Sequence, residues 1–363
     1  MPTADQQPHI LMIPVTAATG AGEYYRSLTI ANGLRTRFPQ ARIEFILNKH
    51  SRIEHSPDFP AFYVDGSPTL NTEAVNKILE DNRPDIAIFD GAGRVAQMRH
   101  AKRLDIRTVF VSSRPGKRRM GFRWRAMRHM DHHWIAQSGF SHTLSRRERF
   151  KLAVLPSAPD IYYLSALFPE PDPETRNAVL SELGIDPAKP YVLFTPGGGG
   201  WKVSGQPAGE IFAEAARDFA QDTGTQTIAL LGPQYEGPLP DYPGVITCRS
   251  LSNRKLINLM HGAHILAVGT GTIAMQALAL QRPGVYALTG GSDQPARHRL
   301  IERLETGLAV ETTGEALYNG VMRLHDNPAL RERCLENIRA LGLQNDLPVA
   351  VNAVDSLLRA KAG

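Results

Sequence analysis

The stretch ILAVGTGTIAMQALAL, residues 265–280, decides how the chain folds. It opens with an apolar run of strand length, continues through the turn Gly269-Thr-Gly-Thr272, and ends in the helical pattern 273–280. Glycine lets the backbone adopt positive φ and approach a ligand closely. The free N–H groups at the start of the next helix favour an anion, usually a phosphate. A strand, a glycine turn and a helix in this order therefore predict a phosphate-binding turn in an α/β fold.

Two further glycine-rich turns follow apolar runs, Thr19-Gly-Ala-Gly-Glu-Tyr-Tyr-Arg26 and Thr195-Pro-Gly-Gly-Gly-Gly200. One such turn is often no more than a tight connection, but three of them favour ligand binding. None has the P-loop spacing. None is a full G-x-G-x-x-G with an acidic partner about 20 residues later. The pattern therefore favours a nucleotide-sugar site over a dinucleotide dehydrogenase.

Strand-like runs alternate with helical patterns along the whole chain, which predicts parallel sheets covered by helices on both faces. The predicted strands are 10–15, 43–47, 86–90, 108–112, 191–195, 227–231, 245–248, 265–268 and 284–288. The predicted helices are 24–34, 72–82, 95–104, 175–183, 211–219, 254–261, 273–280, 296–304, 328–341 and 349–360.

The proline-rich, acidic stretch that begins at Phe168 interrupts this alternation and is typical of a linker. We therefore expect an N-terminal Rossmann-like domain over 1–167 and a linker over 168–190. A C-terminal Rossmann-like domain would cover 191–345. The last helix, 346–363, would return to the N-terminal domain.

The composition is ordinary for a soluble protein, with 42% hydrophobic and 21% charged residues and no apolar run long enough to span a membrane. Two isolated cysteines indicate neither a disulfide framework nor a zinc site, so the sequence predicts a cytoplasmic protein. The charge is uneven, because residues 1–170 hold 24 Lys and Arg against 16 Asp and Glu. The basic half is the one expected to meet an anionic partner.

The order of motifs resembles a branch of the GT-B superfamily. That branch holds the lipid II-forming N-acetylglucosaminyltransferase and the UDP-sugar hydrolase of pseudaminic acid synthesis. The resemblance rests on Gly20-Ala-Gly-Glu-Tyr-Tyr-Arg-Ser-Leu28, on Ile86-Ala-Ile-Phe-Asp90-Gly, on residues 256–283, and on Asp293-Gln294. It implies a GT-B architecture, two Rossmann-like domains facing a cleft. It implies no metal and no cofactor.

The resemblance also implies roles for individual residues. The diphosphate of the donor would lie on the turn 269–272 and beside 197–200, the base near 250–251, and the sugar hydroxyls near 293–294. Gln276 stands where the family usually has a ribose-binding Glu. The donor residues implied are Gly197, Gly198, Gly199, Gly200, Ser250, Leu251, Gly269, Thr270, Gly271, Thr272, Gln276, Asp293 and Gln294.

Glu23 is the main departure, because the family commonly has His directly after the second glycine of the first turn. A carboxylate can also act as the general base that an inverting transfer requires. Glu23 and Asp90 are therefore the two catalytic candidates. Each also has a structural interpretation, Glu23 as a first-turn carboxylate that stabilises its helix and Asp90 as a cap at a strand end.

A basic stretch with interleaved aromatic and Met residues covers 114–128 and contains no acidic residue. It would suit an anionic membrane surface or a phosphate-bearing acceptor, such as a lipid-linked sugar or a glycan. It could equally be a solvated face with ion pairs. No nucleic-acid motif accompanies it, so no nucleic-acid partner is expected. The residues expected to face an acceptor or a membrane are Gly20, Gly22, Arg26, Arg118, Arg119, Arg123 and Trp124.

Three functions remain open from the sequence. The first is a glycosyltransferase that uses a nucleoside-diphosphate sugar, with UDP as the expected nucleotide, at the inner face of the membrane or free in the cytoplasm. The second is a UDP-sugar hydrolase or epimerase on the same scaffold. The third is a module that binds a nucleotide sugar or a membrane surface without catalysis.

Overall fold

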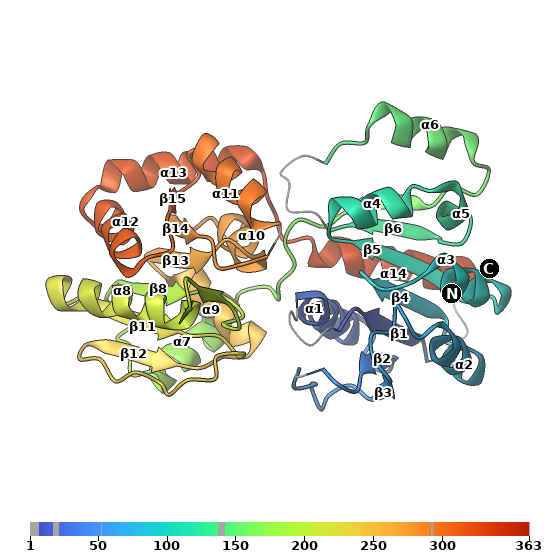
Figure 1. The fold of residues 1–363 in the computed structure, drawn as a ribbon, viewed down its shortest axis with the longest axis horizontal. Coiled ribbons are helices and arrows are strands. Elements are labelled where there is room, and N and C mark those ends of the chain that lie inside the picture. The colour runs from blue at the N-terminus through green and yellow to red at the C-terminus, as the bar shows by residue number, and fades with distance from the viewer. Residues whose placement is uncertain (1–6, 17–21, 52, 137–141, 292, 363) are drawn as a thin grey trace. The chain divides into compact units, whose positions relative to one another are not determined.

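The computed structural model describes residues 7–16, 22–51, 53–136, 142–291 and 293–362 (Figure 1). The chain divides into two compact units. The N-terminal unit comprises Met1–Leu167 and Asp346–Gly363, and the C-terminal unit comprises Phe168–Asn345. Each unit is a parallel sheet with helices packed on it.

The N-terminal unit contains a seven-stranded sheet in the order β3-β2-β1-β4-β5-β6-β7, with every neighbouring pair parallel. Its strands are β1 (His9–Pro14), β2 (Arg42–Asn48), β3 (Ala61–Val64), β4 (Ile86–Asp90), β5 (Arg107–Ser112), β6 (His132–Ile135) and β7 (Asp160–Tyr163). Its helices are α1 (Gly22–Arg37), α2 (Thr72–Asn82), α3 (Val95–Arg103), α4 (Pro115–Gly121), α5 (Trp124–Met127), α6 (Arg146–Val154) and α14 (Leu347–Ala362).

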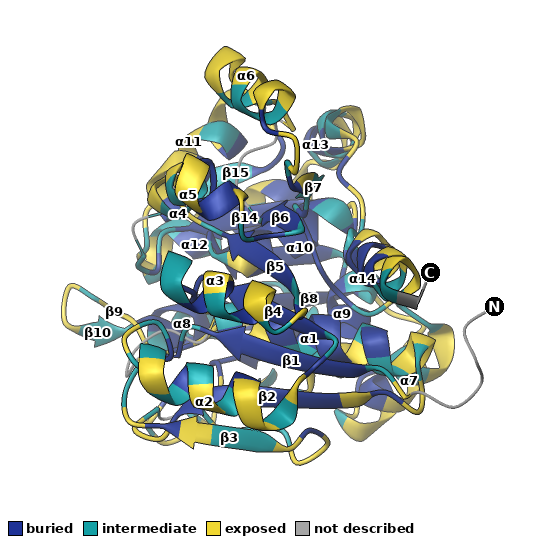
Figure 2. Ribbon diagram, turned by 90° about the vertical axis from the view of Figure 1, so that its right-hand side faces the viewer, coloured by how far each residue is buried: buried dark blue, intermediate teal, exposed yellow. Residues whose placement is uncertain are grey.

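The central strands β1, β4 and β5 are buried on both sides, so both faces of the sheet are apolar there. On β1, Ile10 and Met12 belong to the core formed with α1 and α14, while Leu11 and Ile13 belong to the core formed with α2 and α3. Successive side chains of a strand point to opposite faces, so this arrangement needs a continuous apolar run. Figure 2 shows β1, β4 and β5 as buried, whereas α6 is largely exposed.

Helix α14 packs against α1, although more than 300 residues separate the two helices in the chain. The contact is close at Gly33 of α1, where an added Cβ would lie 2.9 Å from Leu347 Cδ1. Val351 also contacts this position, at 3.1 Å. A glycine on α1 thus admits the side chains of α14 into the core of the N-terminal unit.

The C-terminal unit contains a six-stranded parallel sheet in the order β12-β11-β8-β13-β14-β15, and a small antiparallel pair β10-β9. The strands are β8 (Tyr191–Thr195), β9 (Lys202–Val203), β10 (Gln206–Pro207), β11 (Gln226–Leu230), β12 (Val245–Cys248), β13 (Ile265–Gly269), β14 (Gly284–Ala287) and β15 (Leu308–Val310). The helices are α7 (Pro173–Glu182), α8 (Ala208–Thr223), α9 (Asn253–Gly262), α10 (Thr272–Ala279), α11 (Gln294–Arg303), α12 (Gly314–Asp326) and α13 (Pro328–Leu341).

The segment 168–190 contains α7, which packs against α9 of the C-terminal unit. Asp172 caps α7 by accepting from Thr175 N, and its carboxylate also lies 2.9 Å from the guanidinium of Arg254 on α9. The backbone N–H of Asp172 donates to Asn258 Oδ1 over 2.7 Å. The proline-rich start of this segment is therefore held on the C-terminal unit.

Candidate functional site

The candidate residues of the N-terminal unit lie where the order of its sheet reverses. The chain runs outward from β1 to β2 and β3 on one side, and from β4 to β7 on the other. In open α/β sheets, ligands bind at such a switch point, outside the carboxyl ends of the strands. Glu23 lies in the first turn of α1, after β1, and Asp90 is the last residue of β4. A Cβ on Gly91 would lie 3.1 Å from Glu23 Cγ, so the two segments are in contact.

The carboxylate of Asp90 is fully buried and held by two side chains of α1. Arg26 Nε donates to Asp90 Oδ2 over 2.9 Å, and a second guanidinium nitrogen donates to Oδ1 over 2.5 Å. The hydroxyl of Ser27 donates to Oδ2 over 3.1 Å. Burial raises the pKa of Asp90, and the charge of Arg26 opposes that rise. The arrangement ties α1 to the end of β4 and engages both carboxylate oxygens.

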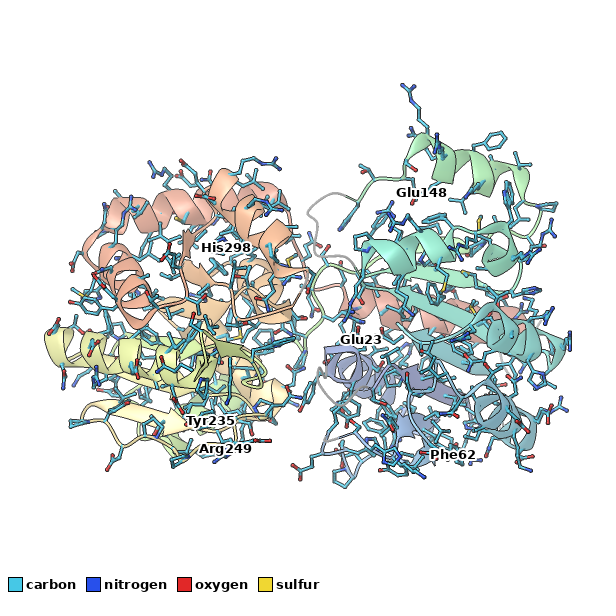
Figure 3. All side chains as sticks on the ribbon, viewed as in Figure 1. Glu23, Phe62, Glu148, Tyr235, Arg249 and His298 are labelled. Carbon is cyan, nitrogen blue, oxygen red and sulfur yellow. The ribbon has the colours of Figure 1, made fainter. Side chains whose placement is uncertain are left out.

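Glu23 lies on α1 of the N-terminal unit (Figure 3), and its carboxylate is next to a basic side chain. Its side chain is 15% exposed, and Oε1 lies 3.6 Å from the guanidinium of Arg114. Burial lowers the pKa of Lys117, with Arg114 and Arg94 acting in the same direction and Glu23 opposing them. Of the two catalytic candidates, Glu23 is the more exposed, because the side chain of Asp90 is 0% exposed.

The other predicted acceptor-side residues have different surroundings. Gly20 lies outside the described residues, and Gly22 is the first residue of α1, with open space where a Cβ would stand. Arg26 has an 11% exposed side chain and is paired with Asp90. Its guanidinium is therefore engaged by a buried carboxylate inside the unit.

The basic stretch 114–128 forms helices α4 and α5, although the sequence analysis assigned no helix to it. Phe122 and Met127 are buried in a core cluster. Arg118 forms a two-pronged ion pair with Glu148 of α6, over 2.9 Å at each contact. Part of the stretch is thus structural. Arg119, Arg123 and Trp124 remain exposed.

Helix α6 extends this exposed surface. No residue of α6 is buried, and Phe150 and Val154, one helical turn apart, are 63% and 55% exposed. Lys151 Nζ donates to Phe122 O over 2.8 Å, which holds α6 against the turn between α4 and α5. We call the exposed residues Arg119, Arg123, Trp124, Arg146, Arg147, Arg149, Phe150 and Val154 the basic apolar surface.

The glycine turns of the C-terminal unit also meet at a switch point, between β8 and β13. After β8, Gly197 and Gly199 adopt φ of +93° and +77°. A Cβ on Gly199 would lie 2.3 Å from the carbonyl oxygen of Leu231, so this turn presses on the loop after β11. A Cβ on Gly269, at the end of β13, would lie 2.3 Å from Pro196 O. Only glycine allows these backbones to approach so closely.

The turn after β13 leads directly into α10. Gly271 is the N-cap, and Thr272 is the first helical residue and is exposed. The hydroxyl and the backbone N–H of Thr270 each donate to Ala287 O over 2.8 Å, so Thr270 is fixed to the neighbouring strand β14. Gln276, in the second turn of α10, is 9% exposed. The first-turn amides of a helix have no partner within it, which leaves them available to an anion.

Asp293 and Gln294 begin α11 and organise the loop that follows β14. Gln294 Oε1 accepts from Thr289 N over 2.8 Å and from Gly290 N over 3.2 Å, and the residue is 6% exposed. This side chain thus holds its own loop. Asp293 is the more exposed of the two, with a 38% exposed side chain that lies 3.0 Å from the guanidinium of Arg297.

The loop with Ser250 and Leu251 is anchored by its neighbour Arg249, which the sequence analysis did not single out (Figure 3). Arg249 donates to Gly237 O over 3.0 Å and to Tyr235 O, and its guanidinium lies 5.6 Å from the Tyr235 ring centre. Its own carbonyl accepts from Gly232 N over 2.8 Å. Ser250 is exposed directly after this anchor.

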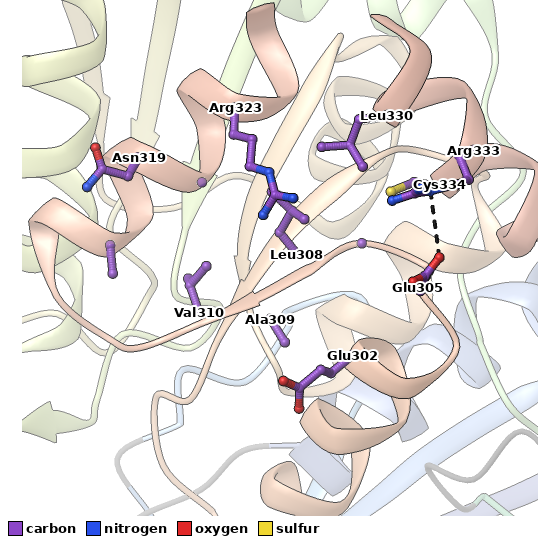
Figure 4. Close-up of a pocket in the computed structure, with 13 residues that line it drawn as sticks. Glu302, Glu305, Leu308, Ala309, Val310, Asn319, Arg323, Leu330, Arg333 and Cys334 are labelled. Carbon is purple, nitrogen blue, oxygen red and sulfur yellow. Dashed lines mark ion pairs between the residues drawn. The ribbon is translucent and has the colours of Figure 1, made fainter. Parts of the chain in front are cut away.

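A further cavity of about 410 Å³ lies along the edge strand β15, between α11, α12 and α13 (Figure 4). It is lined by apolar residues of the strand and by charged residues of the helices and of the turn after α11. Among the charged residues are Arg333 and Glu305, which form an ion pair at 3.6 Å. None of the residues predicted to bind the donor lines it.

Within the ranges that the structure describes, no group of three or more His, Cys, Asp or Glu could hold a metal ion. His132 and His133, which the sequence places near His129 and Asp131, point into the N-terminal core as part of β6 and are 3% and 0% exposed.

No helix among the described residues is long and apolar enough to cross a membrane.

No protein-family model matches the sequence, and no curated protein matches it significantly. Solved structures do resemble it over nearly its whole length. The calicheamicin glycosyltransferase CalG4 is 16% identical, with a TM-score of 0.61, over 99% of this chain and 100% of that one. Phytolacca americana UGT2, complexed with UDP-2-fluoro-glucose and pterostilbene, is 12% identical, with a TM-score of 0.61, over 98% and 100%. A UDP-N-acetylglucosamine 2-epimerase is 14% identical, with a TM-score of 0.55, over 98% and 97%.

These likenesses establish the fold. The chain has the GT-B fold, with two parallel-sheet α/β units of seven and six strands, as the sequence analysis predicted.

Proposed function

We propose that the protein is a glycosyltransferase that moves a sugar from a nucleoside-diphosphate donor, a UDP-sugar, to an acceptor with inversion at the anomeric carbon. One observation carries the proposal. In each unit, the candidate residues lie at the point where the order of the sheet reverses, Glu23 between β1 and β4 and the glycine turns between β8 and β13. This is where open α/β sheets bind ligands. Glycosyltransferases of the same fold, one with a UDP-sugar analogue bound, support the choice of reaction.

In this proposal the C-terminal unit holds the donor. The amides that begin α10 bind the diphosphate, because they carry partial positive charge and lack helical partners. The turn after β8 lines the diphosphate, Ser250 and Leu251 meet the base, and Gln276 meets the ribose. Asp293 faces the sugar, and Gln294 positions the loop after β14 beside it. Helix dipoles and amides then take the place of a metal ion at the leaving diphosphate.

The N-terminal unit provides the base. Glu23 takes the proton from the acceptor hydroxyl while that oxygen attacks the anomeric carbon, and the bond to the diphosphate oxygen breaks with its electron pair. Asp90 acts through Arg26 and Ser27, which fix the first turns of α1 and so the position of Glu23. Arg114 and Lys117 beside Glu23 favour an acceptor that carries negative charge.

The basic apolar surface supports a contact with an anionic membrane, on which a lipid-linked acceptor would be presented. A helix with exposed Phe and basic residues and no buried residue suits the interface between headgroups and acyl chains. Each Lys or Arg near such a surface contributes about 1 kcal/mol.

The test is turnover of UDP-sugars by the wild-type protein and by Glu23→Gln, with and without a lipid or glycan extract. UDP release only with the extract supports transfer. Glu23→Gln should lose at least about 100-fold in turnover while it still binds UDP, because a general base contributes about 10²–10⁴-fold. Glu73→Gln is the matched control, since Glu73 is also a first-turn carboxylate, on α2. It should keep wild-type turnover.

Other results would overturn parts of the proposal. UDP release without any acceptor would favour a hydrolase, and conversion of the sugar without UDP release an epimerase, a reaction named for one of the similar structures. Wild-type turnover in Glu23→Gln would remove Glu23 from the catalytic residues. Binding of UDP-sugars with no turnover under any condition would indicate a binding module.

A further inference from the structure

Arg297 on α11 is a buried guanidinium directly against the turn before α10. It is 3% exposed, and one of its terminal nitrogens donates to both Thr270 O and Gly271 O. The other terminal nitrogen lies 3.0 Å from Asp293 Oδ2. Arg297, which stands 26 positions after Gly271, thus binds two consecutive carbonyls of the turn.

These two contacts fix the direction of two amides. In a trans peptide unit, the carbonyl of one residue and the N–H of the next point in opposite directions. Because the carbonyls of Thr270 and Gly271 point to Arg297, the N–H groups of Gly271 and Thr272 point away from it. Two successive amides on one side form a concave site for an anion. Thr272, which carries the second of these amides, is an exposed residue.

Burial of this charge costs desolvation free energy, which indicates that the buried position of Arg297 has a function. Removal of an ion from water costs several kcal/mol even after relaxation, and a packed apolar side chain would avoid that cost. Burial lowers the pKa of Arg297, and the pairing with Asp293 opposes the change. Arg297 Nε has no hydrogen-bond partner among the described residues, so the guanidinium is not fully compensated.

We propose that Arg297 is a positioning residue for the diphosphate of the donor, an inference that rests on the proposed function. It orients the turn 270–272 through its carbonyls, so that the amides of Gly271 and Thr272 are held in place before the phosphates arrive. Such preorganisation avoids a rearrangement of the backbone at binding. Arg297 acts through the backbone and needs no contact with the ligand.

The experiment compares the binding of UDP and of uridine by calorimetry, in the wild-type protein and in Arg297→Met. Uridine lacks the phosphates, so its affinity does not depend on the two amides. We expect Arg297→Met to lose at least about tenfold in affinity for UDP, equivalent to about 1.4 kcal/mol, and to keep its affinity for uridine. If Arg297 had only a structural role, the substitution would lower the affinity for UDP and for uridine to the same extent.

Arg331→Met is the matched control, because Arg331 also donates to two successive carbonyls of the C-terminal unit, those of Leu324 and His325. It should leave the preference for UDP over uridine unchanged. Should Arg297→Met fail to fold, Arg297→Lys decides. It retains the charge but not the two-pronged geometry, and it should raise KM for the donor with little change in kcat.

The outcomes separate this inference from the proposed function. If the wild-type protein binds no nucleoside diphosphate, the proposed function fails. If the wild-type protein binds UDP and both Arg297 variants keep its preference for UDP over uridine, the proposed function stands and the role of Arg297 is refuted.

Discussion

Lowering the pH from about 7.5 to about 5 should destabilise the N-terminal unit, and His133 on β6 should account for about 2 kcal/mol of the loss. His133 is fully buried under α4, where a Cβ on Gly121 would lie 2.4 Å from the imidazole ring. Ser112 Oγ is 2.9 Å from its Nε2, and its Nδ1 has no partner within the part of the chain that the structure describes. Burial, reinforced by Arg118, lowers the pKa of His133 to about 3.

The sign and size of the effect follow from that pKa. The native state binds the proton more weakly than the unfolded state does, in which the pKa is about 6.5. The contribution to the free energy of unfolding is therefore complete above about pH 6.5 and is lost as the pH falls toward about 3. Below the unfolded pKa, each pH unit lowers the free energy of unfolding by about 1.4 kcal/mol. A pH about 1.5 units below that pKa therefore lowers it by about 2 kcal/mol.

Urea unfolding at both pH values measures this loss. Trp134 is fully buried next to His133 on β6, so its fluorescence follows the N-terminal unit, and a Trp201→Phe background removes the signal of Trp201 in the C-terminal unit. His133→Gln keeps an amide that can bond Ser112 but does not titrate. Between the two pH values, the free energy of unfolding of His133→Gln should fall by about 2 kcal/mol less than that of the parent. Burial lowers the pKa of His132 as well, so the parent loses more than the His133 share. Equal losses in the two proteins would refute the reasoning.

Two further predictions concern backbone space and the basic apolar surface. Gly199→Ala should lower the free energy of unfolding at least about 2 kcal/mol more than Gly205→Ala, measured by urea unfolding. Both glycines have positive φ, but a Cβ would meet Leu231 O at 2.3 Å in the first and nothing within 4 Å in the second. Equal losses would mean that the turn can relax. The protein should sediment with anionic phosphatidylglycerol vesicles but not with neutral phosphatidylcholine vesicles, and Phe150→Ser should weaken that binding. Absence of binding to the anionic vesicles would contradict the membrane contact.

Much of the fold could be predicted because the central strands of both sheets are buried on both faces, and their sequences are therefore apolar runs. Helix α2 and strand β4 have the bounds that the sequence predicts, Thr72–Asn82 and Ile86–Asp90. Strand β6 was missed, because its sequence His132-His-Trp-Ile135 is polar at its start. The two histidines pack against rings from other parts of the chain, those of Phe110, Phe122 and Tyr162.

The glycine turns could be located from the sequence because a strand, glycines and a helix form a local pattern. The partners of the candidate residues could not be predicted from the sequence, because they come from distant segments of the chain. Asp90 meets Arg26 from 64 residues away, and Arg297 reaches Thr270 from 27 residues away. Nothing near Arg297 in the sequence distinguishes it from the exposed arginines of the same helix. Only the folded C-terminal unit shows that it is buried against the turn.

The packing of α14 on α1 has a consequence for synthesis of the chain. The core of the N-terminal unit includes Val351 and Val354, so it cannot be completed until the ribosome has released these residues. The C-terminal unit is continuous from Phe168 to Asn345 and emerges in full before α14 does. The unit whose synthesis begins first is thus the one that is completed last. Until α14 packs on α1, the apolar surface around Gly33 stays uncovered, and chaperones bind such surface.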